Sequence, residues 1–363
     1  MPSDLIPALD PAPLPGPPWL FHLLWVLTFF IHLLFVNGVL GGTLLAALTP
    51  RDRPGGARTQ RFFVELNGWA ISLAITFGIA PLLFLQVLLG RFFYSATVLV
   101  AWAWLGMLGL LTLAYYLNYL AKHRLRKGEA ATGILWTEAL LFLGVAAVHV
   151  TVNLAHLQPA RWAGLAAQPW SALLDPTFLP RYLHFVLAAL GFSGALLAFA
   201  ALRVTGEEED RRATARLGLR AALLATALQV LDGFWLLLAL PAPVLKGFMR
   251  GGALTMVPLT LGILLALGLL ALLARNFDPL AQPVRVRRVL ELTVAAMVPM
   301  VLTRHQLRDV YLAVPRAGEQ AVVAPQWGPF FLFFGVFILC VGLTVWAVVL
   351  AVKDRPGPGE PVA

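Results

Sequence analysis

Histidine is the residue type whose number and placement most suggest chemistry in this sequence. Seven histidines occur, and six of them fall inside long apolar stretches: His22, His32, His149, His156, His184 and His305. An ionisable side chain inside a membrane is costly and is treated as functional by default. One such histidine could simply hydrogen-bond between helices, but six together favour the binding of a metal-bearing cofactor.

Haem is the cofactor that this set of histidines fits best. Iron in a porphyrin takes only one or two axial ligands from the protein, His and Met among them. Zinc would need three or four convergent ligands, and the sequence has no HExxH motif. A single cysteine, Cys340, excludes a disulfide framework and a cysteine-ligated cluster, and no CxxCH motif is present for covalent haem attachment.

Composition shows which solvent surrounds these histidines. The 363 residues are 60% hydrophobic and only 12% charged, with a mean hydropathy of +0.81, whereas soluble domains carry roughly 25% charged residues. The lipid bilayer must therefore be the solvent for most of the chain. The formal net charge of +9 does not indicate a nucleic-acid partner, because the basic residues lie in short loops between apolar stretches.

The predicted fold class is an all-α integral membrane protein, a bundle of about nine transmembrane helices. A spanning helix needs roughly 20 apolar residues. The predicted spans are 19–48, 63–89, 96–120, 133–157, 182–203, 219–242, 253–274, 289–313 and 328–352.

The distribution of basic residues predicts the orientation of the bundle. Of the 27 Lys and Arg residues, 19 lie in four loops and the C-terminal tail, namely 51–61, 122–130, 203–220, 275–288 and the residues after 352. The positive-inside rule then places the N-terminus outside and the C-terminus in the cytoplasm. The first residues lack a basic segment and are not typical of a cleaved signal peptide.

Three regions are expected from this pattern. Residues 1–18 would form a Pro-rich extracytoplasmic N-terminus, 19–352 a single transmembrane haem-binding bundle, and 353–363 a cytoplasmic tail. The protein would be a multi-pass component of a bacterial-type inner membrane.

Helix geometry places the six histidines in the outer or middle part of the bilayer. At about 1.5 Å per residue, His32 would lie roughly 20 Å from the outer surface and His149 about 12 Å. His149 and His156 are seven residues apart and share a helix face. We interpret His156 as an interfacial residue and His149 as the buried one of the pair.

Two segments that contain histidine share a loose pattern. FIHLLFVNGVLGGTLLAAL and YLHFVLAALGFSGALLAFAAL each have a histidine, an aromatic residue and then small residues. Small residues let helices or a flat ligand approach closely. We expect four residues after His32 to make room for a porphyrin: Asn37, Gly38, Gly41 and Gly42.

Other side chains in these stretches have weaker signals. Met256 by itself indicates packing, because methionine in a membrane helix normally fills space. Asp232 is the most central acid, and it could carry a proton or accept a hydrogen bond from a neighbouring helix. Arg181, Arg304 and Arg308 lie near the outer face, where they could pair with haem propionates or mark the interface.

Several of these positions fall in segments that resemble subunit I of the cytochrome bd quinol oxidases. WVLTFFIHLLFVNGVLG places His32 where that family has a haem-ligating histidine. RYLHFVLAALGFSGAL places His184 where the family ligates its low-spin haem, and ALTMVPLTLG places Met256 where it supplies the second ligand of that haem. NLAHLQPARW and TRHQLRDVY, around Arg304, are fainter similarities.

The chain also departs from that family. The long quinol-binding loop is reduced to a few residues around PAPVLKGFMRGG, and TFGIAPLLFLQVLLGRFF lacks the acids that serve the oxygen-reducing haem. Leu254 stands in place of an arginine, the acid ligand of a high-spin haem is replaced near Trp346, and His149 and His156 stand where the family has other residues. The resemblance therefore implies a divergent member with low-spin haem chemistry.

The resemblance and the histidines together predict two or more haems of type b. His184 and Met256 would be the axial pair of a low-spin haem, with Arg181 and Arg304 near it. His32 would ligate a second haem, which His149 would complete on the other side of the ring. Another haem type and a bound quinone stay open.

Three functions are carried forward. The leading hypothesis is a haem b electron-transfer subunit that passes electrons between the quinone pool and an extracytoplasmic redox partner, such as a cytochrome c or a second membrane subunit. The second is a cytochrome bd-like terminal oxidase or small-gas reductase subunit. The third is a non-redox transporter, which Pro81 and Pro258 would favour if they break helices at mid-membrane.

Overall fold

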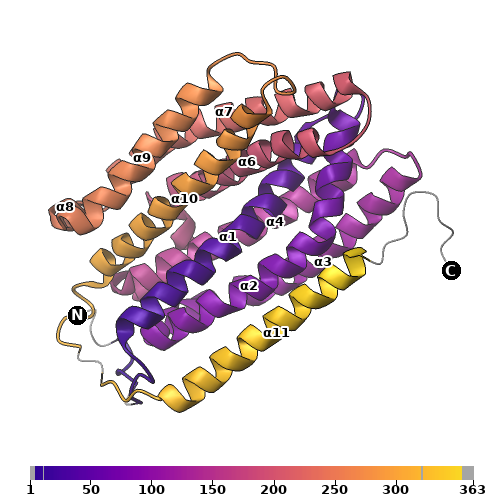
Figure 1. The fold of residues 1–363 in the computed structure, drawn as a ribbon. Coiled ribbons are helices and arrows are strands. Elements are labelled where there is room, and N and C mark those ends of the chain that lie inside the picture. The colour runs from indigo at the N-terminus through magenta and orange to yellow at the C-terminus, as the bar shows by residue number, and fades with distance from the viewer. Residues whose placement is uncertain (1–4, 11, 320–321, 354–363) are drawn as a thin grey trace. The chain divides into compact units, whose positions relative to one another are not determined.

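A computed structural model describes residues 5–10, 12–319 and 322–353, and these are helical almost throughout (Figure 1). The longer helices are α1 Pro18–Leu48, α2 Gly56–Leu99, α3 Ala101–Arg126, α4 Thr132–Leu157, α6 Phe178–Arg203, α7 Glu208–Ala239, α9 Ala253–Leu273, α10 Pro283–Leu312 and α11 Trp327–Lys353. The shorter ones are α5 Trp162–Ala167 and α8 Ala242–Arg250, with 3₁₀ turns at Pro159–Arg161 and Pro169–Leu174. The described residues contain no strand, only an isolated bridge between Leu14 and Val323.

Seven of these helices are long and apolar enough to cross a membrane: α1, α2, α3, α4, α6, α7 and α9. The predicted all-α membrane bundle is therefore confirmed. The two other predicted spans correspond to α10 and α11. The 30 residues of α10 include charged side chains near both of its ends, and α11 is an apolar helix of 27 residues.

The chain divides into two compact units. The larger contains His22–Glu319 and the short segment that ends at Leu9, and it holds the histidines and arginines discussed above. The smaller contains Asp10–Phe21 and the described chain beyond Glu319. Within the smaller unit, the Leu14 N–H donates to the Val322 carbonyl at 2.8 Å, and the Ala324 N–H donates to the Leu14 carbonyl at 2.9 Å.

Glycines bring α6 and α7 into backbone contact. A Cβ atom on Gly194 would lie 2.6 Å from the Gly218 carbonyl oxygen, and one on Gly218 would lie 2.5 Å from the Gly194 oxygen. Small residues allow this approach in membrane bundles, where van der Waals packing and interhelical hydrogen bonds hold helices together. The contact fixes the register that places His184 of α6 against Asp232 of α7.

The second half of α1 is packed with similar density. A Cβ atom on Gly41 would lie 2.0 Å from the Ala189 carbonyl oxygen, and one on Gly42 would lie 2.2 Å from Phe63 Cδ1. The expectation that these two glycines make room for a porphyrin is wrong, because the backbone of α6 and the ring of Phe63 take up the space.

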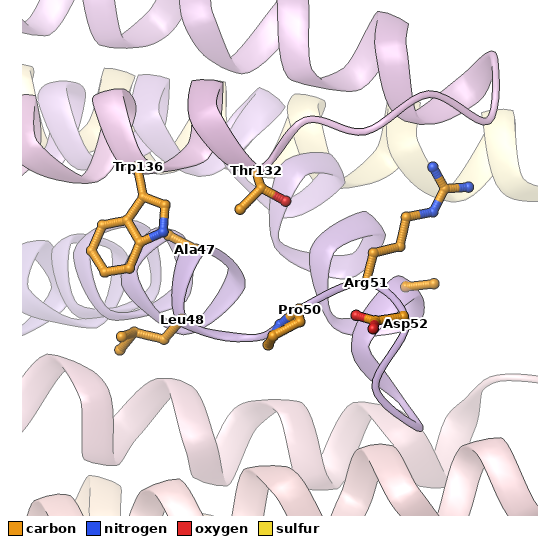
Figure 2. A pocket seen from close by; sticks show the side chains of 8 residues that line it. Ala47, Leu48, Pro50, Arg51, Asp52, Thr132 and Trp136 are labelled. Atoms are coloured by element: carbon orange, nitrogen blue, oxygen red, sulfur yellow. The ribbon is translucent and has the colours of Figure 1, made fainter.

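An open pocket of about 620 Å³ lies where α1 ends and α4 begins (Figure 2). It is lined by Ala47, Leu48, Pro50, Arg51, Asp52, Ala57, Thr132 and Trp136. Arg51 donates to the carbonyls of Gly128 and Glu129, which ties the two loops at this end together. His22 lies near the start of α1 and His156 near the end of α4. Both are at the far end of their helices from this pocket, so the pocket is separate from the candidate site.

Candidate functional site

A cavity of about 260 Å³ lies between α1, α6, α7, α9 and α10, wholly within the larger unit. Its volume is close to the lower end of the range of roughly 300–1,000 Å³ for small-molecule sites. Most of its wall is apolar, and the polar side chains in the wall include Asn37, Arg181, His184, Gln229 and Arg304. An apolar space with a few convergent polar groups is the usual form of a ligand site.

His184 is held in this cavity by two residues of α7. Its Nδ1 lies 3.1 Å from Oδ2 of Asp232, and its Nε2 lies 3.4 Å from Nε2 of Gln229. A carboxylate only accepts hydrogen bonds, so the hydrogen of the neutral ring is on Nδ1 and the lone pair is on Nε2. Metal-ligating histidines are usually oriented in this way, with the second nitrogen bonded to a carboxylate or carbonyl.

The cavity also borders a cluster of buried basic side chains. Arg181 and Arg304 line it, and Arg308 and His156 lie within electrostatic range of both. Four arginine nitrogens of this cluster are buried without a hydrogen-bond partner: Nε and one terminal nitrogen of Arg181, Nε of Arg304 and Nε of Arg308. Buried charge is strongly unfavourable unless it is paired, so the cluster favours an anionic ligand.

Aromatic rings hold two of these guanidinium groups in place. The Arg304 guanidinium lies 4.6 Å from the ring centre of Phe29, and that of Arg308 lies 3.9 Å from Trp25. Such cation–π contacts stabilise a cation, but they leave its N–H groups in the guanidinium plane available to an acceptor. The two arginines are thus held in place, and Arg308 also lies within electrostatic range of Asp309.

Met256 does not line the cavity, although it is half-buried on α9. It lies one helical turn before Leu259, which does line it. The methionines in the cavity wall are Met297 and Met300 of α10. Met297 accepts a hydrogen bond from Asn37 at 3.8 Å, and Met300 reaches α9, where a Cβ atom on Gly262 would lie 2.2 Å from its Cε.

The structure brings His32 and His149 within electrostatic range of each other and of Arg304. Nδ1 of His32 donates to the Ala74 carbonyl at 2.8 Å, and Nδ1 of His149 donates to the Val145 carbonyl at 3.0 Å. Each ring therefore keeps the lone pair of Nε2 available as a ligand.

The interpretation of His156 as an interfacial residue is wrong, because its side chain is packed inside the bundle. His156 is 2% exposed, and His149 is exposed. The reason is that the segment after α4 folds back over the end of that helix. There Trp162 is buried and donates its indole N–H to the Ala155 carbonyl at 2.8 Å.

His22 and His305 form a pair for which the sequence suggested no role. Arg308 donates to Nδ1 of His305 at 3.2 Å, so the ring hydrogen of His305 is on Nε2, which donates to Nδ1 of His22 at 2.9 Å. Trp25 packs edge-on against His305 with 5.0 Å between ring centres. These two histidines thus bond to each other, whereas His184 faces the cavity.

Several residues at the site were missed by sequence reasoning. Gln229, Met297 and Met300 carry no sequence signal, because an amide or a methionine in an apolar helix usually packs or hydrogen-bonds. Asp232 stands out as a central acid, but nothing in the sequence pairs it with His184. In the described residues, no group of three or more His, Cys, Asp or Glu side chains could hold a metal ion. This finding does not concern haem, because haem iron needs only one or two protein ligands.

Comparisons with known proteins show the fold. No protein-family model and no curated protein matches this chain. Among solved structures, a chain from "The structure of bd oxidase from Geobacillus thermodenitrificans" matches with a TM-score of 0.68 and 13% sequence identity, over 94% of this chain and 99% of that one. At this identity the likeness concerns the fold alone.

Proposed function

We propose that this protein is a haem b membrane subunit that transfers electrons between the quinone pool and an extracytoplasmic redox partner. One observation carries the proposal: the cavity has His184 in its wall and unpartnered arginine N–H groups beside it. Haem combines an iron that takes axial histidine with carboxylates that arginine binds well. The bd oxidase fold supports the same reading.

The residues of the cavity fit haem. His184 would bind the iron through Nε2, and Arg181 and Arg304 would hold the propionates. When bound, haem supplies a one-electron ferric/ferrous couple. The cavity of about 260 Å³ is small for a porphyrin, so the flexible side chains of Met297 and Met300 would rotate to admit the ring.

Two further ligand assignments belong to this proposal. Met256 would complete the low-spin haem of His184, on the resemblance of ALTMVPLTLG to the bd oxidases. His32 and His149 would ligate a second haem, since each has its Nδ1 bonded to a carbonyl and its Nε2 free for iron.

The proposed function also includes a direction across the membrane. With the N-terminus outside, as the basic loops predict, the first 18 residues are extracytoplasmic and the residues after 352 are cytoplasmic. The cavity and the basic cluster then lie toward the outer side of the 19–352 bundle. A cytochrome c or a second membrane subunit would exchange electrons there.

A terminal oxidase or small-gas reductase is the second candidate, and the likeness to the bd oxidase structure favours it. Oxygen uptake by the purified protein with a quinol or a cytochrome c as donor separates the two candidates. No described feature favours a transporter, because α2 and α9 continue through Pro81 and Pro258, and the non-helical residue inside α2 is Leu89.

Haem content tests the proposal directly. We expect the wild-type protein, purified from haem-replete cells, to give a b-type pyridine haemochrome and a reduced-minus-oxidised spectrum. His184→Ala should lose one haem equivalent and stay folded. His123→Ala is the matched control, because His123 is exposed in the last turn of α3. Wild-type protein without haem, or full haem content in His184→Ala, would overturn the assignment.

A further inference from the structure

The hydrogen bond between Asp232 and His184 is the best-defined polar contact of the cavity. It joins α6 to α7 across 3.1 Å, and the Asp232 side chain is only 6% exposed. The second oxygen of the carboxylate, Oδ1, is buried without a hydrogen-bond partner. The interaction of this carboxylate is thus directed at one atom, His184 Nδ1.

The surrounding structure is built to keep this contact. The glycine contact of α6 with α7 leaves the two helices no freedom to move closer. Gly233, next to Asp232, faces the His184 ring, since a Cβ atom there would lie 3.5 Å from His184 Cε1. Gln229 approaches the other ring nitrogen from the same helix, one turn earlier. The ring orientation of His184 is therefore set by α7.

A carboxylate in this position changes the chemistry of the ligand. An acceptor at Nδ1 fixes the tautomer and makes Nε2 more basic. A more basic ligand and a nearby negative charge both stabilise ferric iron over ferrous iron, which lowers the reduction potential. The adjacent arginines and a thioether ligand act in the opposite direction, since Met ligation raises the potential.

We infer that Asp232 is a positioning residue for the haem ligand His184: it holds the ring hydrogen on Nδ1 and so leaves the lone pair on Nε2, which the iron would take over from the Gln229 amide, and its charge lowers the reduction potential of the bound iron. This inference rests on the proposed haem site. Through Asp232, α7 would help to set the reduction potential although it supplies no ligand to the iron.

Redox titration of two Asp232 variants separates charge from orientation. Asp232→Asn keeps an acceptor for Nδ1–H but removes the charge, so the ferric/ferrous equilibrium should shift at least tenfold toward ferrous, which is about 59 mV for one electron. Asp232→Glu keeps a carboxylate and should have a reduction potential close to that of the wild type. Asp232→Ser has a short neutral acceptor, so its reduction potential should shift in the same direction as that of Asp232→Asn. It replaces the Asn variant in the titration if that variant loses haem.

Glu138→Gln is the matched control, because it makes the same acid-to-amide change at another buried carboxyl group, which lies on α4 and bonds to Asn67. Its potential should stay at the wild-type value. An unchanged potential and low-spin spectrum in Asp232→Asn or Asp232→Ser would overturn the inference while the haem site stands. A wild-type protein that contains no haem would instead overturn the proposed function itself.

Discussion

The two halves of α1 are packed in opposite ways. All residues from Asn37 to Ala47 are buried, whereas between His22 and Val36 only Trp25 is. The tight half lies against α6 and α2 through Gly41 and Gly42. The loose half carries two of the histidines and, at Leu33, borders the cavity. The tight half leaves no space for a cofactor at Gly41 and Gly42, because these two glycines are already used for helix contact.

Polar groups differ between the same two regions. Beside the tight half of α1, the Asn67 amide donates to Thr43 at 2.8 Å and to Glu138 at 3.3 Å, so these groups bond to each other, with one oxygen each of Asn67 and Glu138 left without a partner. Beside the loose half, the buried Nε–H groups of Arg181, Arg304 and Arg308 lack acceptors. The first region holds the bundle together, and the second needs a partner from outside the chain.

The largest effect on stability should come from adding a methyl group to the tight half of α1. We expect Gly41→Ala to abolish folding or to cost at least about 3 kcal/mol, because the new Cβ would overlap the Ala189 backbone. Gly38→Ala is the matched control, since its Cβ would lie 3.8 Å from Leu66 and fits without strain. Yield and thermal unfolding in detergent measure both variants, and equal stability would contradict the packing contrast.

The next effect concerns the loose half, where His32 and His149 face a shared haem in our proposal. Such a bis-His iron has no open position, so the reduced wild-type protein should not bind carbon monoxide. His149→Ala should gain binding, measured by the CO-difference spectrum, while His305→Ala should not. Strong CO binding by the wild-type protein would show an open iron and favour the oxidase candidate instead.

A smaller effect distinguishes the methionines at the cavity. If Met256 is the second ligand of the His184 iron, Met256→Leu should lower the reduction potential by about 59 mV or more, a tenfold change in the redox equilibrium, because thioether ligation raises it. Met297→Leu and Met300→Leu are the controls. A lower reduction potential in Met300→Leu, with an unchanged potential in Met256→Leu, would show that Met300 and not Met256 ligates the iron.

Sequence reasoning predicts elements better than it predicts contacts between them. Apolar length locates the helices, and residue type marks His184, Arg181 and Arg304. The pairing of His184 with Asp232 depends on how α6 and α7 fit at Gly194 and Gly218, which periodicity does not encode. The glycines after His32 were misjudged for a related reason: small residues indicate close approach but not whether a helix or a ligand approaches.

The burial of His156 was missed because it depends on the segment that follows α4. In that segment Asp175 is held by Thr177, Gln158 and Arg161. This set closes the loop that covers the end of α4, so it is the structural reason why His156 is buried while His149 is exposed.

The smallest predicted effect tests that loop by its pH dependence. Burial alone would raise the pKa of Asp175, but the hydrogen bonds from Thr177 and Gln158 and the charge of Arg161 outweigh it and hold the pKa below its usual value. A lowered folded-state pKa stabilises the fold above the unfolded value of about 3.9, and the gain is lost as pH falls through the folded pKa. Asp175→Asn should therefore cost roughly 1–3 kcal/mol at pH 7, and this difference from wild type should shrink below about pH 4. Melting temperatures of both proteins between pH 7 and pH 3 measure it, with the exposed pair variant Glu291→Gln as control; a constant difference across that range would show that Asp175 does not act through its charge.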